Sequence, residues 1–262
     1  MYNSVHTSFD VMKEFLITGC ELTEKYQFPI IPQCTLDTIP EDSIDFEESF
    51  SRKIKNHRKQ NVNFYIDDTK FTRFWNNPDK YLEHLKCFHS VTMPDFSIST
   101  GERGMPMPLN IYNKYRNHAL AWYLYLNDIT VVPSVPIADK DSYDWCFDGL
   151  PKSSVLSVCT NGRIKAKASR IEFCDGFKVM CDKLEPIKVI IVGRLPDELK
   201  TDVEIVNYMT RNQRINNRMK GWLFMGTSTS RYVRKKNVTK EQQKRNSNNL
   251  KKLDKLNNLK KK

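Results

Sequence analysis

The sequence lacks most of the short motifs that identify a function. It contains no GxxxxGK[ST] and no GxGxxG, so neither common glycine-rich phosphate loop is present. No apolar run approaches the roughly 18 residues that a membrane-spanning helix needs. The first ten residues have neither the basic start nor the apolar centre of a signal peptide. We therefore expect a soluble, cytoplasmic protein without a membrane span.

Metal-binding and redox motifs are equally scarce. The seven cysteines include no CxxC pair, and several fall on apolar faces, which is typical of reduced, buried thiols. His84 and His89 are five residues apart, so they do not form the i, i+4 pair of a helical zinc site. The sequence therefore predicts no structural zinc, no disulfide framework and no Ser/His/Asp triad.

Positive charge is abundant and unevenly distributed. The formal net charge is +11, yet residues 211–262 alone contain 17 Lys and Arg against Glu241 and Asp254, a net of +15. Residues 1–210 are therefore mildly acidic, at −4, and the first 51 residues carry −8. A basic end of this kind favours contact with nucleic acid. Two alternatives are that it contacts an acidic protein partner or folds back onto the acidic amino end.

The stretch from residue 61 to 97 predicts a strand, a helix and a strand. Val62, Phe64 and Ile66 alternate as in a half-buried strand, and apolar residues then recur at helical spacing up to Phe88 before a second strand. This βαβ pattern implies parallel strands joined by a right-handed crossover.

Further along, the pattern predicts helices at 109–127 and 168–184 and strands at 129–135, 154–159, 187–192 and 203–206. We expect an α/β fold with a mostly parallel sheet of about six strands built from βαβ units, either doubly wound or an incomplete (β/α) barrel. The predicted organisation is an amino-terminal helical and extended cap (1–60), an α/β core domain (61–210) and a basic, partly disordered tail (211–262). The cap includes helical turns at 7–17 and around Phe46 and Phe50.

Acidic residues follow the predicted strands, at the end of the sheet where ligands collect in α/β folds. Asp67, Asp95 and Asp148, with Arg116 from the long helix, form a candidate catalytic set. If the protein is an enzyme, these carboxylates, together with Asp68 and Asp139, could meet at this edge and hold Mg²⁺. Lys152, Asn161 and Arg194 would complete an anion-binding edge. The structural alternatives are that Asp67 or Asp68 caps a helix, with Asp68 favoured, that Asp148-Gly149 is a turn, and that Arg116 pairs with a carboxylate such as Asp95.

The basic end interleaves cations with aromatic rings, which is the combination that neutralises phosphates and stacks on bases. Its alternative is a merely solubilising extension. The predicted nucleic-acid-binding residues are Arg211, Arg214, Arg218, Lys220, Trp222, Arg231, Tyr232, Arg234, Lys235 and Lys236.

Several segments together resemble a family of bacterial and phage proteins known as a domain of unknown function, DUF4417-like. They include DDTKFTRFWNNPDKYLEHLKCF, VTMPDFS, LNIYNKYRNHALAWYL, YDWCFDGLPKSSVLSV and VIIVGRLPDEL, between Phe64 and Val206. The resemblance implies a mixed α/β domain in proteins encoded by phages and other mobile elements, and it brings no established activity. The basic tail lies outside it.

Three functions follow from these observations. The leading hypothesis is a mobile-element-encoded protein that binds nucleic acid through its basic end, largely without sequence specificity. The second is a barrel-type enzyme that uses the carboxylates and Arg116 on a phosphorylated or nucleic-acid substrate. The third is an accessory factor in replication, packaging or anti-defence that binds a protein partner.

Overall fold

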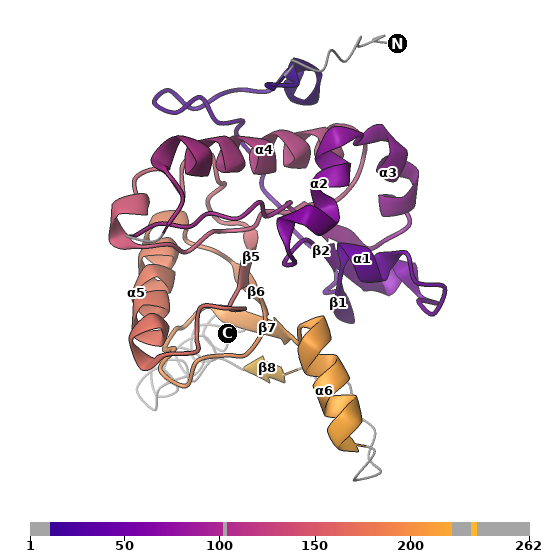
Figure 1. The fold of residues 1–262 in the computed structure, drawn as a ribbon, viewed down its shortest axis with the longest axis vertical. Helices are drawn as coiled ribbons and strands as arrows, with labels where there is room; N and C mark the ends of the chain where they lie inside the picture. Colours follow the sequence, from indigo (N-terminus) through magenta and orange to yellow (C-terminus); the bar gives the residue numbers. More distant parts are fainter. Residues whose placement is uncertain (1–10, 102–103, 222–231, 235–262) are drawn as a thin grey trace, which may run out of the picture.

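The computed structural model describes residues 11–101, 104–221 and 232–234, and strands alternate with helices through most of this chain (Figure 1). Helices α2, α3 and α4 lie together beside the strands, α5 lies separately, and α6 projects away from the end of β7 (Figure 1). The strands are β1 (Asp42–Asp45), β2 (Gln60–Asn63), β3 (Ser90–Thr92), β4 (Val131–Val132), β5 (Val155–Cys159), β6 (Lys188–Val192), β7 (Glu204–Tyr208) and β8 (Tyr232–Arg234). The helices are η1 (Glu14–Ile17), α1 (Phe46–Ser49), η2 (His57–Lys59), α2 (Asp68–Asn76), α3 (Asp79–Leu85), α4 (Met107–Leu126), η3 (Lys140–Ser142), α5 (Lys167–Leu184) and α6 (Arg211–Gly221).

The parallel strands follow the order of the chain. One sheet contains β1 to β4, and the other contains β5, β6 and β7 with β8 antiparallel at its edge. The sheets meet where Ser134 and Ser157 form an isolated parallel bridge. There the Ser157 N–H donates to the Pro133 carbonyl and the Val135 N–H donates to the Ser157 carbonyl, each at 2.8 Å.

This arrangement confirms the predicted, mostly parallel α/β fold. Strand order without reversal is the order of an incomplete (β/α) barrel rather than of a doubly wound sheet. Within the described residues β1 and β7 share no ladder, so the strands do not close into a ring. The carboxyl ends of all seven parallel strands therefore lie along one edge, which we call the carboxyl rim.

Two apolar layers hold the strands in place. The larger lies between strands and helices, where α5 contributes Phe173, Phe177 and Met180 at helical spacing. The smaller lies on the opposite face of β4 to β7 and is covered by the segment around Cys34. Cys34 accepts from the Val155 N–H at 2.8 Å, and its own N–H donates to Ser154 Oγ at 2.9 Å. The extended amino-terminal segment thus fills the inner side of the incomplete barrel.

The helix predicted between the first two core strands is interrupted. It consists of α2 and α3, and the break falls at Asn77, whose φ of −145° is not helical. The cause is Pro78, because proline disfavours helical backbone in the residue before it. The apolar spacing alone does not reveal this interruption.

Strand β1 replaces part of a helical turn that the sequence pattern predicts. Residues 42–45 pair in parallel with 60–63. The residue that hides this strand is Ser43, which is buried although it is polar. The side-chain amides of Asn61 and Asn63 donate to Ser43 Oγ at 2.9 and 3.0 Å, so the buried hydroxyl has partners. An apolar pattern cannot mark a strand in which two of the buried residues, Ser43 and Asp45, are polar.

The predictions for the two ends of the chain can be compared with the structure only where residues are described. Of the helix predicted at 7–17, the described part contains the 3₁₀ turn η1, and residues 7–10 lie outside the described residues. The sequence pattern predicts neither α6 nor β8. The leucine-rich stretch beyond residue 250 lies outside the described residues.

A buried polar cluster links α4 to the amino-terminal segment. Lys114 Nζ is 2.8 Å from His118 Nε2 and donates to the Cys146 carbonyl at 3.0 Å. His118 Nδ1 is 2.7 Å from the Pro29 carbonyl. Because a carbonyl only accepts, Nδ1 carries the proton and Nε2 accepts from Lys114. The cluster fixes the turn that contains Asp148 against α4, away from the carboxyl rim.

Candidate active site at the carboxyl rim

Three neighbouring cavities follow the carboxyl rim. The central cavity, of about 360 Å³, is lined by the loops after β2, β3, β4 and β5 and includes Tyr65, Asp95 and Arg163. A second, of about 370 Å³, includes Lys70 and is called the Lys70 cavity. A third, of about 500 Å³, is called the Glu172 cavity. Together we call them the rim cleft.

Asp95 occupies the central cavity because it directly follows β3. Its side chain is partly buried, and Ser134 Oγ donates to Asp95 Oδ1 at 3.5 Å. Burial raises the pKa of Asp95 from 3.8 to about 6, although the positive charge of Arg163 acts in the opposite direction. A carboxyl group with a pKa of about 6 exchanges its proton near neutral pH, which is the property of a general acid or base.

Tyr65 faces the same cavity from the end of β2. Its hydroxyl donates to Ser157 Oγ at 2.8 Å, so the side chain crosses from one sheet to the other. Burial raises the pKa of Tyr65 well above its ordinary value, and the negative charge of Asp95 raises it further. The phenol therefore stays protonated, and because its single O–H is directed at Ser157, its oxygen is available as a hydrogen-bond acceptor.

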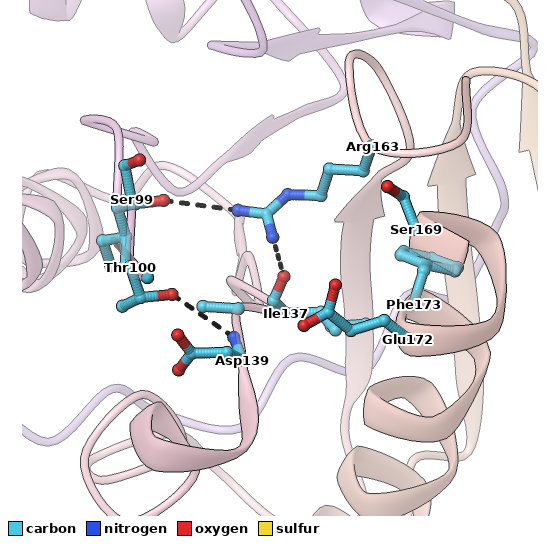
Figure 2. Close-up of a pocket in the computed structure, with 11 residues that line it drawn as sticks. Ser99, Thr100, Ile137, Asp139, Arg163, Ser169, Glu172 and Phe173 are labelled. Carbon is cyan, nitrogen blue, oxygen red and sulfur yellow. Dashed lines mark hydrogen bonds between the residues drawn. The ribbon is translucent and has the colours of Figure 1, made fainter. Parts of the chain in front are cut away.

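Arg163 separates the central cavity from the Glu172 cavity and lines both. It follows a turn in which Gly162 has a φ of +80°, a conformation that glycine adopts without strain. Its guanidinium donates to the Ile137 and Ile98 carbonyls, the latter at 3.3 Å. Figure 2 shows the side chain extending from its loop into the middle of the cavity. These two carbonyls hold a positive charge where an anionic group would bind.

The central cavity also contains Cys159, at the end of β5. Burial raises the pKa of this thiol to about 12. The thiol remains protonated near neutral pH and is a poor nucleophile. Asp95, with its pKa of about 6, is therefore the group of this cavity best suited to exchange a proton near neutral pH.

The Lys70 cavity has a different charge. Lys70 on α2 and Arg211 at the start of α6 both line it and are exposed, and neither forms an ion pair within the described residues. Its two carboxylates are occupied: Asp45 accepts from the Glu48 N–H at 2.7 Å and Asp67 from the Thr69 N–H at 2.9 Å. The two carboxylates keep their negative charge, and Lys70 and Arg211 are the cavity residues with positive charges not engaged in an ion pair among the described residues.

Helix α6 begins at this cavity because of a capping box. The Thr210 N–H donates to Gln213 Oε1 at 2.8 Å, and the Gln213 N–H donates to Thr210 Oγ1 at 3.3 Å. This reciprocal pair fixes Arg211 in the first turn, beside the end of β7.

The Glu172 cavity lies between the loops after β3 and β4 and helix α5 (Figure 2). Glu172 extends from α5 toward Ile137, whereas the Asp139 carboxyl group lies on the side of Thr100 and points away from Glu172 (Figure 2). The Asp139 N–H donates to Thr100 Oγ1 at 3.4 Å, but Asp139 Oδ1 is buried and has no hydrogen-bond partner in the described chain. Ile98, Ile137 and Phe173 supply its apolar wall.

Comparison with known proteins places this architecture in a family. Residues 21–209 match the family described as Domain of unknown function (DUF4417). The chain belongs to this family. The DUF4417 region contains all seven parallel strands and the whole central cavity, whereas Arg211 and the basic end lie outside it.

Two curated relatives are phage proteins. The chain is 29% identical over 134 residues to the "Gene 1 protein" of Mycobacterium phage L5, covering 51% of this chain and 57% of the relative. It is 28% identical over 134 residues to the "Gene 1 protein" of Mycobacterium phage D29, covering 51% of this chain and 48% of the relative. The matches thus span about half the length of each relative. No solved structure matches the chain.

The structure of this DUF4417 protein brings two of the predicted catalytic residues together. Asp67 and Asp95 both line the central cavity. Asp67 is also the N-cap of α2, whereas the sequence analysis favours Asp68 for that role. Asp68 instead accepts from the Ser97 N–H and Oγ, which joins α2 to the loop after β3.

Arg116 and Asp148 lie elsewhere. The Arg116 guanidinium carbon is 3.6 Å from the centre of the Phe96 ring, and the side chain donates to Asn113 Oδ1 rather than pairing with Asp95. Asp148 lies in the turn beside the Lys114 cluster. Neither residue lines the three cavities of the rim cleft.

The three residues proposed to complete an anion-binding edge do not lie together in the structure. Asn161 lines the central cavity and the Lys70 cavity. Lys152 precedes β5, at the opposite end of the sheet, and pairs with Glu185 at 3.3 Å. Arg194 follows β6 and lies 3.8 Å from Asp197.

Tyr65 and Arg163 in the central cavity, with Lys70 and Glu172 in the outer cavities, are among the residues that the sequence analysis does not select. The signal for Tyr65 is its place on the polar side of an alternating strand, opposite Phe64 and Ile66. The signal for Arg163 is a cation that directly follows a strand and a glycine turn. Both signals are common in sequences, and the cavity is what distinguishes these two residues.

The predicted nucleic-acid-binding residues are described only in part. Arg211 is exposed at the Lys70 cavity, whereas Arg214 is buried and bonds to Glu48 and, at 3.5 Å, to Asp42. A contact between the basic end and the acidic amino end is one of the alternatives that the sequence analysis leaves open. The side chains of Arg218, Lys220, Tyr232 and Arg234 are not described, and Trp222, Arg231, Lys235 and Lys236 lie outside the described residues.

The described part of the chain contains neither a cluster of metal ligands nor a membrane-spanning helix. Among the described residues, no group of three His, Cys, Asp or Glu side chains has an arrangement able to hold a metal ion. In the same part of the chain, no helix is both long enough and apolar enough to cross a bilayer.

Proposed function

We propose that this DUF4417 protein is an enzyme that uses Asp95 as a general base on a phosphorylated or nucleic-acid substrate bound in the rim cleft. The observation that carries the proposal is the central cavity, where a carboxyl group with a raised pKa lies beside a fixed arginine and a protonated tyrosine. Perturbed titratable groups in a cavity at the carboxyl ends of parallel strands are typical of active sites.

Each group has a role that its surroundings support. Above about pH 6 the Asp95 carboxylate accepts a proton from the attacking hydroxyl or water, which makes that oxygen a better nucleophile. Arg163 is placed to stabilise negative charge on the substrate, and the Tyr65 hydroxyl oxygen, whose O–H is directed at Ser157, to accept a hydrogen bond from it. Both side chains are held by partners outside the substrate, so little ordering is needed when the substrate binds.

A turnover screen with the full chain tests this function. The panel contains nucleoside monophosphates, a short single-stranded DNA, a short single-stranded RNA and p-nitrophenyl phosphate, with products identified by mass spectrometry. We expect Asp95→Asn to lower turnover by about 10²–10⁴-fold, because the amide cannot accept the proton. The rate of the unchanged protein should rise with pH through about 6.

The matched control is Asp182→Asn, an exposed carboxylate on α5 that lines none of the three cavities. Turnover that Asp95→Asn leaves unchanged, or the absence of turnover across the panel, contradicts the enzyme proposal.

A second candidate function is nucleic-acid binding through the basic end. It is favoured by the net charge of +15 in residues 211–262, and Arg211, the first of these cations, is exposed at the rim cleft. The two phage relatives support a phage or mobile-element origin, in which such binding is useful. Neutralising phosphates releases counterions, so the affinity should fall steeply as salt is raised.

Removal of residues 222–262 tests the second function while keeping every described helix. We expect the shortened chain to bind single-stranded DNA and RNA at least tenfold more weakly, or about 1.4 kcal/mol. The logarithmic slope of affinity against salt should also become shallower. Equal affinity and slope in the two chains would show that these residues do not bind the polymer, and a protein partner would then be sought.

A further inference from the structure

The three cavities lie in a row along the carboxyl rim, with the central cavity between the other two. Tyr65, Asp67 and Asn161 line both the Lys70 cavity and the central cavity. The central cavity and the Glu172 cavity share a different set, Ile98, Ile137 and Arg163. Asp95 lines only the middle cavity. An elongated substrate in the rim cleft would therefore have its reactive part at the centre and a distinct group in each outer cavity.

The Lys70 cavity is suited to a phosphate. Lys70 and Arg211 come from different helices and form no ion pair within the described residues, while the two nearby carboxylates are used as helix caps. The amide side chains of Asn63 and Asn161 also line this cavity and add hydrogen-bond donors. Two cations with neutral donors between them match the oxygens of a phosphate group.

The Glu172 cavity is suited to a nucleobase that carries an amino group. At about 500 Å³ it lies within the usual range for small-molecule sites, and its apolar wall of Ile98, Ile137 and Phe173 suits a flat ring. Its carboxylate acceptors are Glu172, which is exposed, and Asp139, whose buried Oδ1 has no donor within the described residues. Its donors are Arg163 and the hydroxyl groups of Ser99, Thr100 and Ser169. Carboxylates accept hydrogen bonds from the exocyclic amino groups of bases.

We propose that the rim cleft binds a nucleotide with its phosphate between Lys70 and Arg211, its sugar at Asp95 and its amino-bearing base between Asp139 and Glu172. This inference rests on the proposed enzymatic function and names its substrate class and orientation. The nucleotide is either free or part of a single strand, since both present the same chemistry to the cleft.

Binding measurements by isothermal titration calorimetry with the full chain test the orientation. The probes are GMP, AMP, CMP, UMP and ribose 5-phosphate. We expect the three amino-bearing nucleotides to bind about tenfold more tightly than UMP, which lacks an amino donor for the carboxylates. Ribose 5-phosphate, which has no base, should bind more weakly than GMP.

Variants at the two ends should act on different parts of the ligand. Lys70→Met and Arg211→Met should each weaken every probe, ribose 5-phosphate included, by about tenfold. Glu172→Gln and Asp139→Asn should reduce the preference for GMP over UMP and leave ribose 5-phosphate unchanged. Glu172 is exposed, so its variant keeps the test informative if Asp139→Asn unfolds. Lys178→Met and Asp182→Asn, both exposed on α5 and away from the cleft, are the matched controls.

Several results would overturn the proposal. These are equal affinity for ribose 5-phosphate and all four nucleotides, the absence of binding by GMP, AMP and CMP, or equal effects of both variant sets on every probe. Asp95→Asn should retain nucleotide binding. If the catalytic role of Asp95 is wrong, turnover does not depend on Asp95 although the nucleotide still binds, so the two proposals fail in different measurements.

A short single strand with a terminal phosphate distinguishes the two sources. Tighter binding than GMP that remains sensitive to Glu172→Gln identifies the polymer as the source, and affinity equal to that of GMP identifies the free nucleotide. Binding of the strand that is insensitive to Glu172→Gln, with no binding of GMP, AMP or CMP, overturns the proposal and assigns the strand to the basic end.

Discussion

At the scale of single residues, the protein keeps two ionisable groups where burial opposes their charge. Asp95 is partly buried in the central cavity and Lys114 is almost fully buried beneath the amino-terminal segment. The first adjoins the proposed substrate site, whereas the second binds His118 and Cys146 and lines none of the three cavities. The pH dependence of stability that comes from Asp95 therefore concerns the proposed site, and that from Lys114 concerns the fold.

Asp95→Asn should stabilise the protein at alkaline pH. The pKa of Asp95 is raised to about 6 in the folded state, so its contribution to stability is fully present below the unfolded pKa of 3.8 and is lost as pH rises through 6. The amide removes this loss. We expect the variant to exceed the unchanged protein by about 1–3 kcal/mol at pH 8 and to match it at pH 4, as measured by urea unfolding. A variant that is less stable at pH 8 would show that the attraction between the Asp95 carboxylate and the positive charge of Arg163 dominates.

Lys114→Met should remove a pH dependence of the opposite sign. The pKa of Lys114 is lowered by burial from 10.5 to about 7, so the unfolded chain binds an extra proton between these values and stability rises with pH across this window. Between pH 6.5 and 9.5 the unchanged protein should gain on the order of 2–3 kcal/mol relative to the variant. Parallel stability curves for the two proteins would contradict a neutral lysine above pH 7.

At the scale of elements, helix starts and strand ends place the site. Asp67 caps α2, a capping box starts α6 at Thr210, and Pro78 divides α2 from α3. These local signals bring Lys70 and Arg211 to the same cavity although they are far apart in the chain. Asp67 has two roles in this arrangement, since it caps a helix and lines the cleft.

Substitution at Asp67 separates those roles. Asp67→Ala should lower the midpoint of thermal unfolding, because the Thr69 N–H loses its acceptor, whereas Asp67→Ser keeps a capping oxygen and most of that stability. Thermal unfolding measures both variants. If the carboxylate also serves the cleft, Asp67→Ser lowers turnover while its stability is retained. Unchanged turnover in Asp67→Ser would leave Asp67 with the capping role alone.

Periodicity was sufficient to predict most elements and the edge of the sheet that carries the cavities. The alternation at Val62, Phe64 and Ile66 predicts β2, and the position of Asp95 after β3 predicts its place at the rim. Strand β1 was not predicted because its buried Ser43 is satisfied by asparagine amides from the neighbouring strand. Arg163 was missed for a related reason, since its partners are backbone carbonyls from two distant loops. Partners that are remote in sequence leave no local pattern.

At the scale of the whole molecule, charge of opposite sign connects the two ends of the chain. Arg214 on α6 donates to the Ser43 carbonyl at 2.9 Å and bonds to Glu48, which joins the end of the last parallel strand to the first. Tyr208 adds a bond from its hydroxyl to the Pro40 carbonyl. Within the described residues no ladder joins β1 to β7, so these side chains make the connection.

Arg214→Met should therefore destabilise the fold by about 3–5 kcal/mol, because Glu48 and Asp42 lose their common partner. The matched control on the same helix is Arg211→Met, which should leave stability within about 0.5 kcal/mol because Arg211 is exposed. Urea unfolding of both variants measures the difference. Equal stability of the two variants would mean that α6 contributes little to the connection between the sheets.

The isolated bridge between Ser134 and Ser157 has a mechanical consequence. Among the described residues this bridge is the ladder contact between the two sheets, and the Tyr65 hydroxyl spans it by its bond to Ser157. Because so little backbone pairing joins the two sheets there, we expect them to hinge at this bridge and to widen the cleft when a ligand enters. Amide hydrogen exchange would reveal it: the Val135 and Ser157 amides should exchange well before those of Val189–Ile191, and a bound ligand should slow them.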